Sequence, residues 1–103
     1  MKTIRRDVLL RKAKAGKLVR VESYQFDDMY GESRTEAGKD GAVEIPVRIC
    51  DGARDCKEGY CNLTEFEFGT KSGAAWRNEN GTITMVVHSN MSYTFREVDN
   101  NGK

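Results

Sequence analysis

The chain has 103 residues, a formal net charge of +1, 38% hydrophobic residues and 32% charged residues. This length fits one domain with one modest core and excludes a second domain with a core of its own. Chains that stay disordered combine low hydrophobicity with high net charge, which this sequence lacks, and it contains no apolar run long enough for a transmembrane helix.

The first twenty residues are strongly basic, with eight basic side chains against the acidic Asp7, whereas the remainder carries nine basic and fifteen acidic side chains. The pattern predicts a short helix over 5–15, capped by Thr3 or Asp7 and ended by Gly16. A basic end on an acidic body indicates an acidic partner, and we expect it to bind nucleic acid or another polyanion. The residues expected to bind it are Lys2, Arg5, Arg6, Arg11, Lys12, Lys14, Lys17 and Arg20.

The N-terminal segment also indicates the cellular compartment of the protein. "DVLL" is followed at once by "RKAKAGK", so the start lacks the apolar region of a signal peptide. We therefore expect a cytoplasmic protein, without a membrane partner, in which cysteines stay reduced.

Alternating apolar residues predict strands at 17–26 and 42–50. Both faces of the first strand carry apolar residues, which favours a central position. Pro46 favours a sheet edge for the second, because proline cannot donate to a strand ladder. Residues 27–41 between them, "DDMYGESRTEAGKDG", show no periodicity and predict a long, exposed, mobile acidic loop.

The second half of the chain holds the clearest strand signals, at 82–88 and 92–98, which read as one hairpin. Residues 62–69 fit either a strand or a single helical turn opened by a capping box of Thr64 and Glu67. Residues 70–81 read as a loop with a turn at Asn80-Gly81, and 99–103 as a frayed tail.

These elements predict the α+β class, with an N-terminal helix packed on a mostly antiparallel sheet of four to five strands. Residues 1–98 would form a single small domain. The residues expected in its core are Leu9, Val19, Val21, Ile45, Val47, Ile83, Met85, Val87, Tyr93 and Phe95.

All three cysteines lie in the segment 49–61, "ICDGARDCKEGYC". A tetrahedral zinc site needs four ligands, commonly in two close pairs. Cys56 and Cys61 could form a half-site that Cys50 and His88 would complete. The simplest interpretation is ordinary reduced thiols, and zinc or a redox dithiol remain alternatives.

No motif for catalysis is present. The glycines never form a phosphate-binding loop, and the lone His88 has no recognisable partner set, so we expect no catalytic residues and no enzymatic activity. Trp76 reads as a side chain at the core edge, with a stacking platform for a base or ligand as the alternative.

Two resemblances add to this reading. "MKTIRRDVLLRKAKAGKLVRVESYQFDDMYGESR", "EIPV" and "TITMVVHSNMSYTF" resemble small uncharacterised proteins carried on mobile elements of gut bacteria, which implies a bacterial accessory role. "LLRKAKAGKLVRV", residues 9–21, is similar to the end of a winged-helix or excisionase unit, where a basic helix runs through glycine into a β-wing. The helices expected to precede that unit are missing from the sequence.

Three functional hypotheses therefore stand. The first is a small accessory protein that binds nucleic acid through its basic N-terminal segment. The second is a protein-interaction module that uses the acidic loop 27–41 or a sheet edge. The third is a metal-binding module built on the cysteines.

Overall fold

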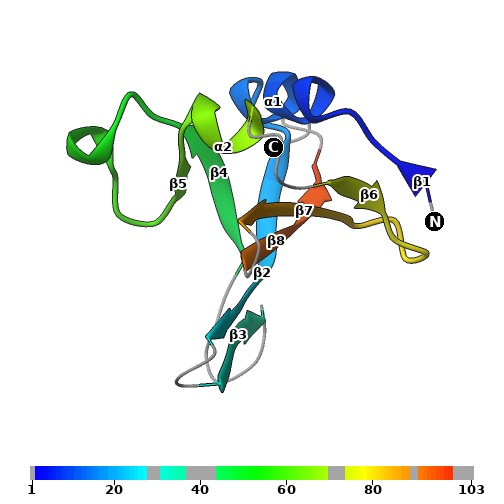
Figure 1. Cartoon of the computed structure of the whole chain (residues 1–103). Helices are drawn as coiled ribbons and strands as arrows, with labels where there is room; N and C mark the ends of the chain where they lie inside the picture. Colours follow the sequence, from blue (N-terminus) through cyan, green and yellow to red (C-terminus); the bar gives the residue numbers. More distant parts are fainter. Residues whose placement is uncertain (1, 28–30, 37–43, 70–73, 89–90, 99–103) are drawn as a thin grey trace.

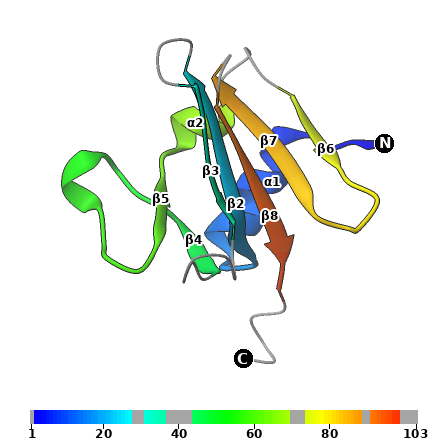
Figure 2. The ribbon, with the colours of Figure 1, turned by 90° about the horizontal axis from the view of Figure 1, so that it is seen from below.

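The computed structural model describes residues 2–27, 31–36, 44–69, 74–88 and 91–98. Within them the chain is α+β, with two helices beside a mixed sheet of eight strands (Figure 1). Seen from below, the strands lie in front and both helices behind, so the helices cover one face of the sheet (Figure 2). The opposite face carries no helix in the described part of the chain.

The N-terminal helix α1 spans Arg6–Lys14 and is amphipathic: Leu9 and Ala13 are buried. The start of the helix differs from expectation. Thr3, one of the expected caps, belongs to the short strand β1 (Lys2–Thr3), and the N-cap residue Arg5 makes no side-chain capping hydrogen bond. Gly16 ends the helix with a φ of 76°, a left-handed conformation that glycine adopts without strain.

The sheet has the strand order β1-β6-β7-β8-β2-β4-β5, with β3 paired to β2 off this path. The expectation of four to five strands was wrong, because several short or polar segments also pair. The remaining strands are β2 (Leu18–Asp27), β3 (Gly31–Glu36), β4 (Ile45–Ile49), β5 (Cys61–Leu63), β6 (Ala75–Arg77), β7 (Ile83–His88) and β8 (Met91–Glu97).

The hairpin expected at 82–98 is confirmed, with β7 and β8 antiparallel and Thr84 opposite Thr94. The long strand β2 pairs with β8 on one side and with β3 and β4 on the other, as its central position predicted. A register shift between Arg20 and Glu22 marks a bulge at Val21.

The expected loop 27–41 was partly wrong, since residues 31–36 form β3 and close a hairpin with 22–27. This hairpin projects from the sheet on the side away from the helices (Figure 1). Residues 28–30 and 37–41 of the expected loop, like the expected tail 99–103, lie outside the described residues.

Two further segments differ from expectation. The strand β4 is not an edge strand, because it lies between β2 and the parallel strand β5, although the pairing with β5 begins only after Pro46. β4 pairs with β2 at Ile45 and Pro46 and with β5 from Val47 onward. Pro46, which has no backbone N–H to donate, therefore precedes the part of β4 that pairs with β5. Ala75–Arg77, expected as loop, forms β6 between β1 and β7.

The ambiguous segment 62–69 resolves into the end of β5 and the short helix α2 (Glu65–Gly69). One half of the capping box is present: the Thr64 backbone N–H donates to Oε1 of Glu67 at 2.6 Å, whereas the Glu67 N–H donates to the Thr64 backbone carbonyl at 3.1 Å. Helix α2 places Phe68 in the core, where its ring stacks on Phe95 with 6.4 Å between the ring centroids.

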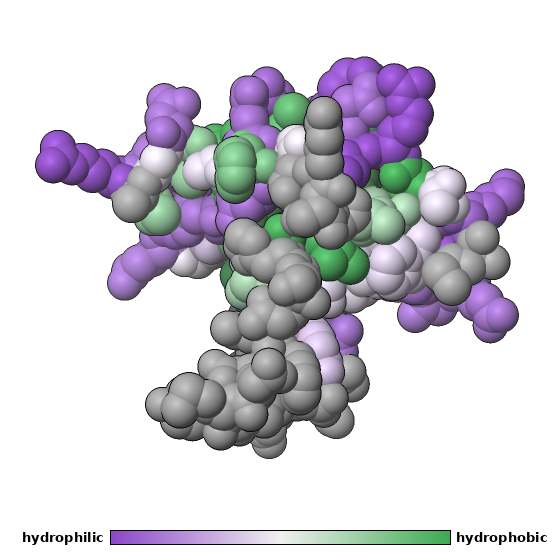
Figure 3. Space-filling model, viewed as in Figure 1, coloured by the Kyte–Doolittle hydropathy of each residue, from purple (hydrophilic) through white to green (hydrophobic). Residues whose placement is uncertain are grey.

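The core lies between the helices and the sheet, and apolar residues show as green patches between hydrophilic surfaces in Figure 3. The expected residues Leu9, Val47, Ile83, Met85, Val87 and Phe95 are buried. Val19, Val21, Ile45 and Tyr93 are only partly buried. Val21 lies on the sheet face opposite the helices, and Val19 pairs in register with Arg96, which lies on that same face. The core also contains Ala13, Leu18, Cys61, Leu63, Phe68 and Ala75.

Candidate functional site

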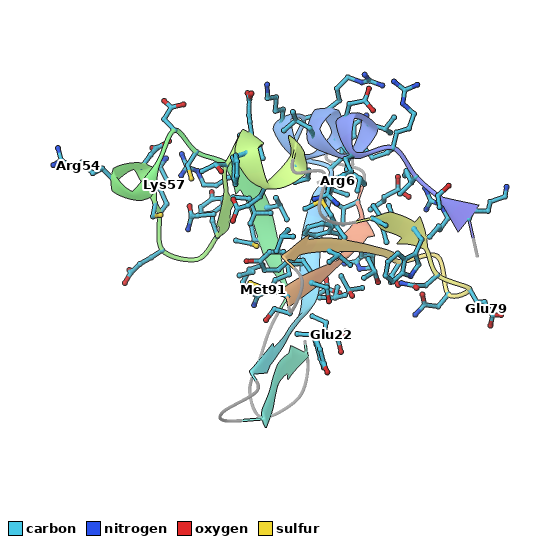
Figure 4. The ribbon with its side chains drawn as sticks, in the orientation of Figure 1. Arg6, Glu22, Arg54, Lys57, Glu79 and Met91 are labelled. Atoms are coloured by element: carbon cyan, nitrogen blue, oxygen red, sulfur yellow. The ribbon has the colours of Figure 1, made fainter. Side chains whose placement is uncertain are left out.

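Arg6, one of the expected nucleic-acid ligands, is instead held inside the fold (Figure 4). Its guanidinium donates from Nε to the Phe68 carbonyl at 3.1 Å, from Nη1 to Val86 at 2.9 Å and from Nη2 to Glu67 at 2.7 Å. Partial burial lowers the pKa of this guanidinium without discharging it. Arg6 therefore joins α1 to the last turn of α2 and to β7.

Four other basic residues of the N-terminal segment form ion pairs. Arg5 and Arg11 both contact the single carboxylate of Asp7, at 2.8 and 3.7 Å. The side-chain hydrogen bond from Arg5 is the largest cause of the lowered pKa of Asp7.

The other two pairs connect α1 to the body. Lys12 contacts Glu97 at 2.8 Å and Lys14 contacts Glu65 at 2.6 Å. Hydrogen bonds from Lys12 and then Arg77 lower the pKa of Glu97.

The remaining three basic residues do not join one patch. Lys2 is exposed on β1 and Lys17 is exposed after α1. Arg20 lies on the helix side of β2, where its Nε is buried and has no hydrogen-bond partner among the described groups. The structure thus does not gather the eight expected ligands into one basic face.

The three cysteines differ in their exposure to solvent. Cys50 and Cys61 are buried, Cys56 is exposed, and all three are free thiols. Cys50 donates its S–H to the Leu63 carbonyl at 3.4 Å. Burial raises the pKa of Cys61 to about 11, although nearby Arg20 opposes the shift. A thiol with this pKa is protonated at neutral pH and is a weak nucleophile.

The described residues contain no group of three or more His, Cys, Asp or Glu side chains able to hold a metal. The side chain of His88, the expected fourth ligand, lies outside the described part of the molecule. Zinc binding by the cysteines therefore stays a prediction.

The cysteine-containing loop 50–60 is organised by polar contacts that the cysteine spacing did not suggest. The Asn62 side chain accepts from the Lys57 N–H at 3.0 Å and donates to the carbonyls of Lys57 at 3.0 Å and Tyr60 at 3.1 Å. Arg48 contacts Asp55 at 3.3 Å across the loop. Hydrogen bonds from the Asp51 N–H and then from Arg48 lower the pKa of Asp55.

A groove of about 820 Å³ lies on the open face of the sheet, opposite the helices. We call it the sheet groove. It runs over β2, β8, β7 and the turn that joins β6 to β7. Its walls are the side chains of Val21, Glu22, Glu44, Asn78, Glu79, Asn80, Thr82, Thr84, Thr94 and Arg96.

The floor of the sheet groove is a chain of hydrogen bonds across four strands. Nε1 of Trp76 donates to Oδ1 of Asn78 at 2.9 Å, and Nδ2 of Asn78 donates to Thr84 at 2.9 Å. The hydroxyls of Thr84 and Thr94 lie 3.2 Å apart, and Thr94 donates to Glu22 at 3.4 Å. The chain holds these side chains in fixed positions before any ligand arrives.

The described lining of the sheet groove contains three carboxylates and one guanidinium. Arg96 is turned onto Glu44, donating from Nε at 3.0 Å and also pairing through Nη2. The hydrogen bond from Arg96 lowers the pKa of Glu44, so this pair stays ionised and neutral overall. Glu22 and Glu79 are the other two carboxylates of the lining, and Figure 4 shows Glu22 projecting below the sheet and Glu79 at the β6–β7 turn.

The sequence held one signal for this groove. Threonines alternate with buried residues in β7, as in Thr82-Ile83-Thr84-Met85, and Thr94 repeats the pattern beside Phe95. Alternation places the hydroxyls together on one face. It could not reveal Asn78 and Trp76, because their segment did not read as a strand.

Comparison with protein-family models, curated proteins and solved structures finds no match for this chain. Among the described residues no helix is long and apolar enough to cross a membrane. The accessory role on a bacterial mobile element stays a prediction.

Proposed function

We propose that this protein is a non-catalytic binding module that holds a partner in the sheet groove. The observation that carries the proposal is the hydrogen-bonded floor from Trp76 to Glu22, which lies on a face without a covering element in the described residues. Side chains that are already ordered lose little entropy when a ligand binds, so the groove is pre-organised for recognition. This function is the protein-interaction hypothesis, with the site placed on the sheet face beside the β2–β3 hairpin.

The test is a map of backbone amide chemical shifts while the labelled protein is titrated with four probes. The probes are a basic peptide, an acidic peptide, a neutral oligosaccharide and a single-stranded oligonucleotide. At least one probe should shift the amides of Thr84, Thr94 and Glu22 at millimolar concentration or below. If no probe shifts these amides, the proposal is wrong.

A matched pair of variants separates binding from folding. Thr84→Val and Thr94→Val together remove two hydroxyls from the floor and should weaken the groove ligand at least about fivefold, since each lost polar contact is worth about 1 kcal/mol. Ser23→Ala is the control, because Ser23 follows Glu22, which lines the groove, and pairs in register with Tyr93, which packs against the core, so Ser23 faces the helix side. The control should bind as the parent protein does.

A second candidate function is binding of nucleic acid or another polyanion by α1. The supporting observation is that Arg5 and Arg11, with side chains 79% and 71% exposed, share only the carboxylate of Asp7. A gel shift at low salt tests it with Arg5→Ala/Arg11→Ala against the parent protein. Loss of the shift in the double variant supports the candidate, and absence of any shift by the parent contradicts it.

We also propose that the protein acts in the cytoplasm. The supporting observation is that its three cysteines are free, two of them buried, as suits a reducing compartment. Fractionation of the cells that make the protein would test this placement.

A further inference from the structure

One row of side chains crosses the open face of the sheet from β1 to β2. Thr3 lies opposite Trp76 on β6, and Trp76 lies opposite Thr84 on β7. Thr84 lies opposite Thr94 on β8, which lies opposite Glu22 on β2. Side chains directly opposite each other on neighbouring strands project to the same face of a sheet. Trp76 therefore lies on the face that carries the sheet groove, beside Thr84 of its lining.

Trp76 is held in one orientation beside the groove. Its side chain is partly exposed, and Nε1, its single polar atom, donates to Oδ1 of Asn78 at 2.9 Å. This bond also orients Asn78, because the oxygen of its amide must face the indole and Nδ2 must face Thr84. With its N–H bonded inside the protein, the exposed part of the Trp76 ring offers an apolar surface to a ligand.

The floor of the groove offers acceptors. The hydroxyl hydrogen of Thr94 goes to Glu22, so the hydroxyl of Thr84, 3.2 Å away, donates to Thr94. Thr84 in turn accepts from Nδ2 of Asn78. Each hydroxyl oxygen has two lone pairs, and these bonds use one of them on each threonine.

The β6–β7 turn offers a donor and a further acceptor at the rim of the groove. Oδ1 of Asn80 accepts from the Thr82 N–H at 3.1 Å and from its hydroxyl at 2.7 Å. Nδ2 of Asn80 is thereby left as the outer end of the amide, without a hydrogen-bond partner among the described residues. The adjacent carboxylate of Glu79 likewise makes no ion pair or hydrogen bond within the described part of the chain. A ligand that meets this lining must both donate and accept hydrogen bonds.

From the aromatic surface and this mixed polarity, we propose that the sheet groove binds a neutral oligosaccharide, with one sugar ring on Trp76. The inference rests on the proposed binding module and gives its partner as a carbohydrate, where the sequence suggested a protein. A sugar hydroxyl both donates and accepts, whereas an ammonium group only donates and a phosphate oxygen only accepts. The C–H groups on the face of a pyranose ring pack on an aromatic surface as other apolar groups do.

The length of the row favours several linked sugars over one. From Trp76 on β6 to Glu22 on β2 the row crosses four strands, about 14 Å at the usual strand spacing of about 4.8 Å. This span is longer than one sugar ring. The ligand is therefore an oligosaccharide that lies across the strands, with hydroxyls over the threonines.

Two other classes of macromolecule fit this lining less well. A nucleic acid needs cations for its phosphates, and the guanidinium of the lining, Arg96, is paired with Glu44. A peptide that adds to a sheet through its backbone needs an unpaired strand edge. The strands under the groove offer none, because β7, β8 and β2 each pair on both sides.

The experiment uses the whole protein and the fluorescence of Trp76, the single tryptophan of the chain. The probes are three neutral hexasaccharides: maltohexaose, cellohexaose and N-acetylchitohexaose. At least one should change the Trp76 emission, protect the ring from quenching by acrylamide and shift the amides of Thr84 and Thr94. Because the ligand is uncharged, its affinity should be the same at about 0.05 M and about 0.5 M sodium chloride. Sorbitol, an open-chain polyol without a ring face, should bind at least about tenfold more weakly.

Aromatic variants complete the test, with affinities measured by amide shifts. Trp76→Ala should weaken the hexasaccharide at least about fivefold, and Trp76→Phe, which keeps an aromatic face, should bind more tightly than Trp76→Ala. Phe66→Ala is the matched control. It removes an aromatic side chain that is 73% exposed on α2, behind the opposite face of the sheet, and should leave the affinity unchanged. Unchanged thermal unfolding of each variant shows that binding, and not folding, is affected.

The outcomes separate this inference from the function beneath it. Equal affinity of the parent protein and Trp76→Ala, or binding of sorbitol as tight as that of the hexasaccharide, overturns the sugar ring on Trp76. If a peptide or an oligonucleotide shifts the groove amides and no hexasaccharide does, the ligand class is wrong and the binding function stands. Absence of every probe from the groove overturns both proposals.

Discussion

Arg6 donates its Nε hydrogen to the carbonyl oxygen of Phe68, 62 residues further along the chain, at 3.1 Å. Two more hydrogen bonds from the same guanidinium reach Glu67 and Val86. A basic residue near the N-terminus thereby satisfies carbonyls at the end of α2 that the helix itself leaves unpaired. The charge of Arg6 therefore contributes to the stability of the fold more directly than to the binding of a partner.

Replacing Arg6 should therefore affect stability. Arg6→Ala removes three charge-assisted hydrogen bonds to partly buried carbonyls, and we expect it to lower the free energy of unfolding by about 2–3 kcal/mol. Arg11→Ala, on the exposed side of the same helix, should lower it by less than about 0.5 kcal/mol. Urea denaturation of both variants measures the difference. Equal values would contradict the structural role of Arg6.

The three cysteines should differ in reactivity. Cys56 is exposed and should react with a thiol reagent within minutes at pH 8, whereas Cys50 and Cys61 should react only as the protein opens. Cys56→Ser should remove the fast phase. The same preparation, analysed for metal without prior chelation, tests the zinc hypothesis, since a cysteine site would retain about one zinc per chain.

The raised pKa of Cys61 predicts a loss of stability at high pH. Its value rises from 9.0 to about 11 on folding, so the folded state favours the protonated thiol. The stabilisation is fully present below pH 9 and is lost as the pH rises from about 9 to about 11. Cys61→Ala removes this titration, so the difference in stability between variant and parent should shrink over that window. A difference independent of pH would contradict the assignment.

Asn62 should control the order of the loop 50–60. Its amide makes hydrogen bonds at both ends of the segment 57–60, and Asn62→Ala leaves those backbone groups without this partner. We expect faster proteolysis within the loop and a loss of about 1–2 kcal/mol. Asn80→Ala, in an exposed turn, is the comparison, and equal cleavage rates in the two variants would show that Asn62 does not hold the loop.

Short-range patterns in the sequence predicted a large part of the fold. The alternation around Ile83, Met85 and Phe95 predicted the β7–β8 hairpin, because side chains on a strand alternate between faces. The end of α1 at Gly16 followed from a local conformational preference. These features depend on residues close together in the chain.

The features that the sequence did not reveal depend on distant partners. The strand β3 is polar and becomes a strand because it pairs with β2, and β6 is three residues held between β1 and β7. The basic side chains looked available as a set, since their partners Glu65 and Glu97 lie far along the chain. The sheet groove likewise combines residues from four strands. In the sequence, the alternating threonines alone resemble the solvent-exposed face of any strand.

The central claim is that the sheet groove holds a partner on its hydrogen-bonded floor, and an amide-shift titration of the parent protein and of Thr84→Val/Thr94→Val tests it most directly. The probe that binds the parent protein most tightly should shift the amides of Thr84 and Thr94, and the double variant should bind it at least about fivefold more weakly, since each lost polar contact is worth about 1 kcal/mol. Equal affinity of the parent protein and the double variant for that probe would contradict the claim.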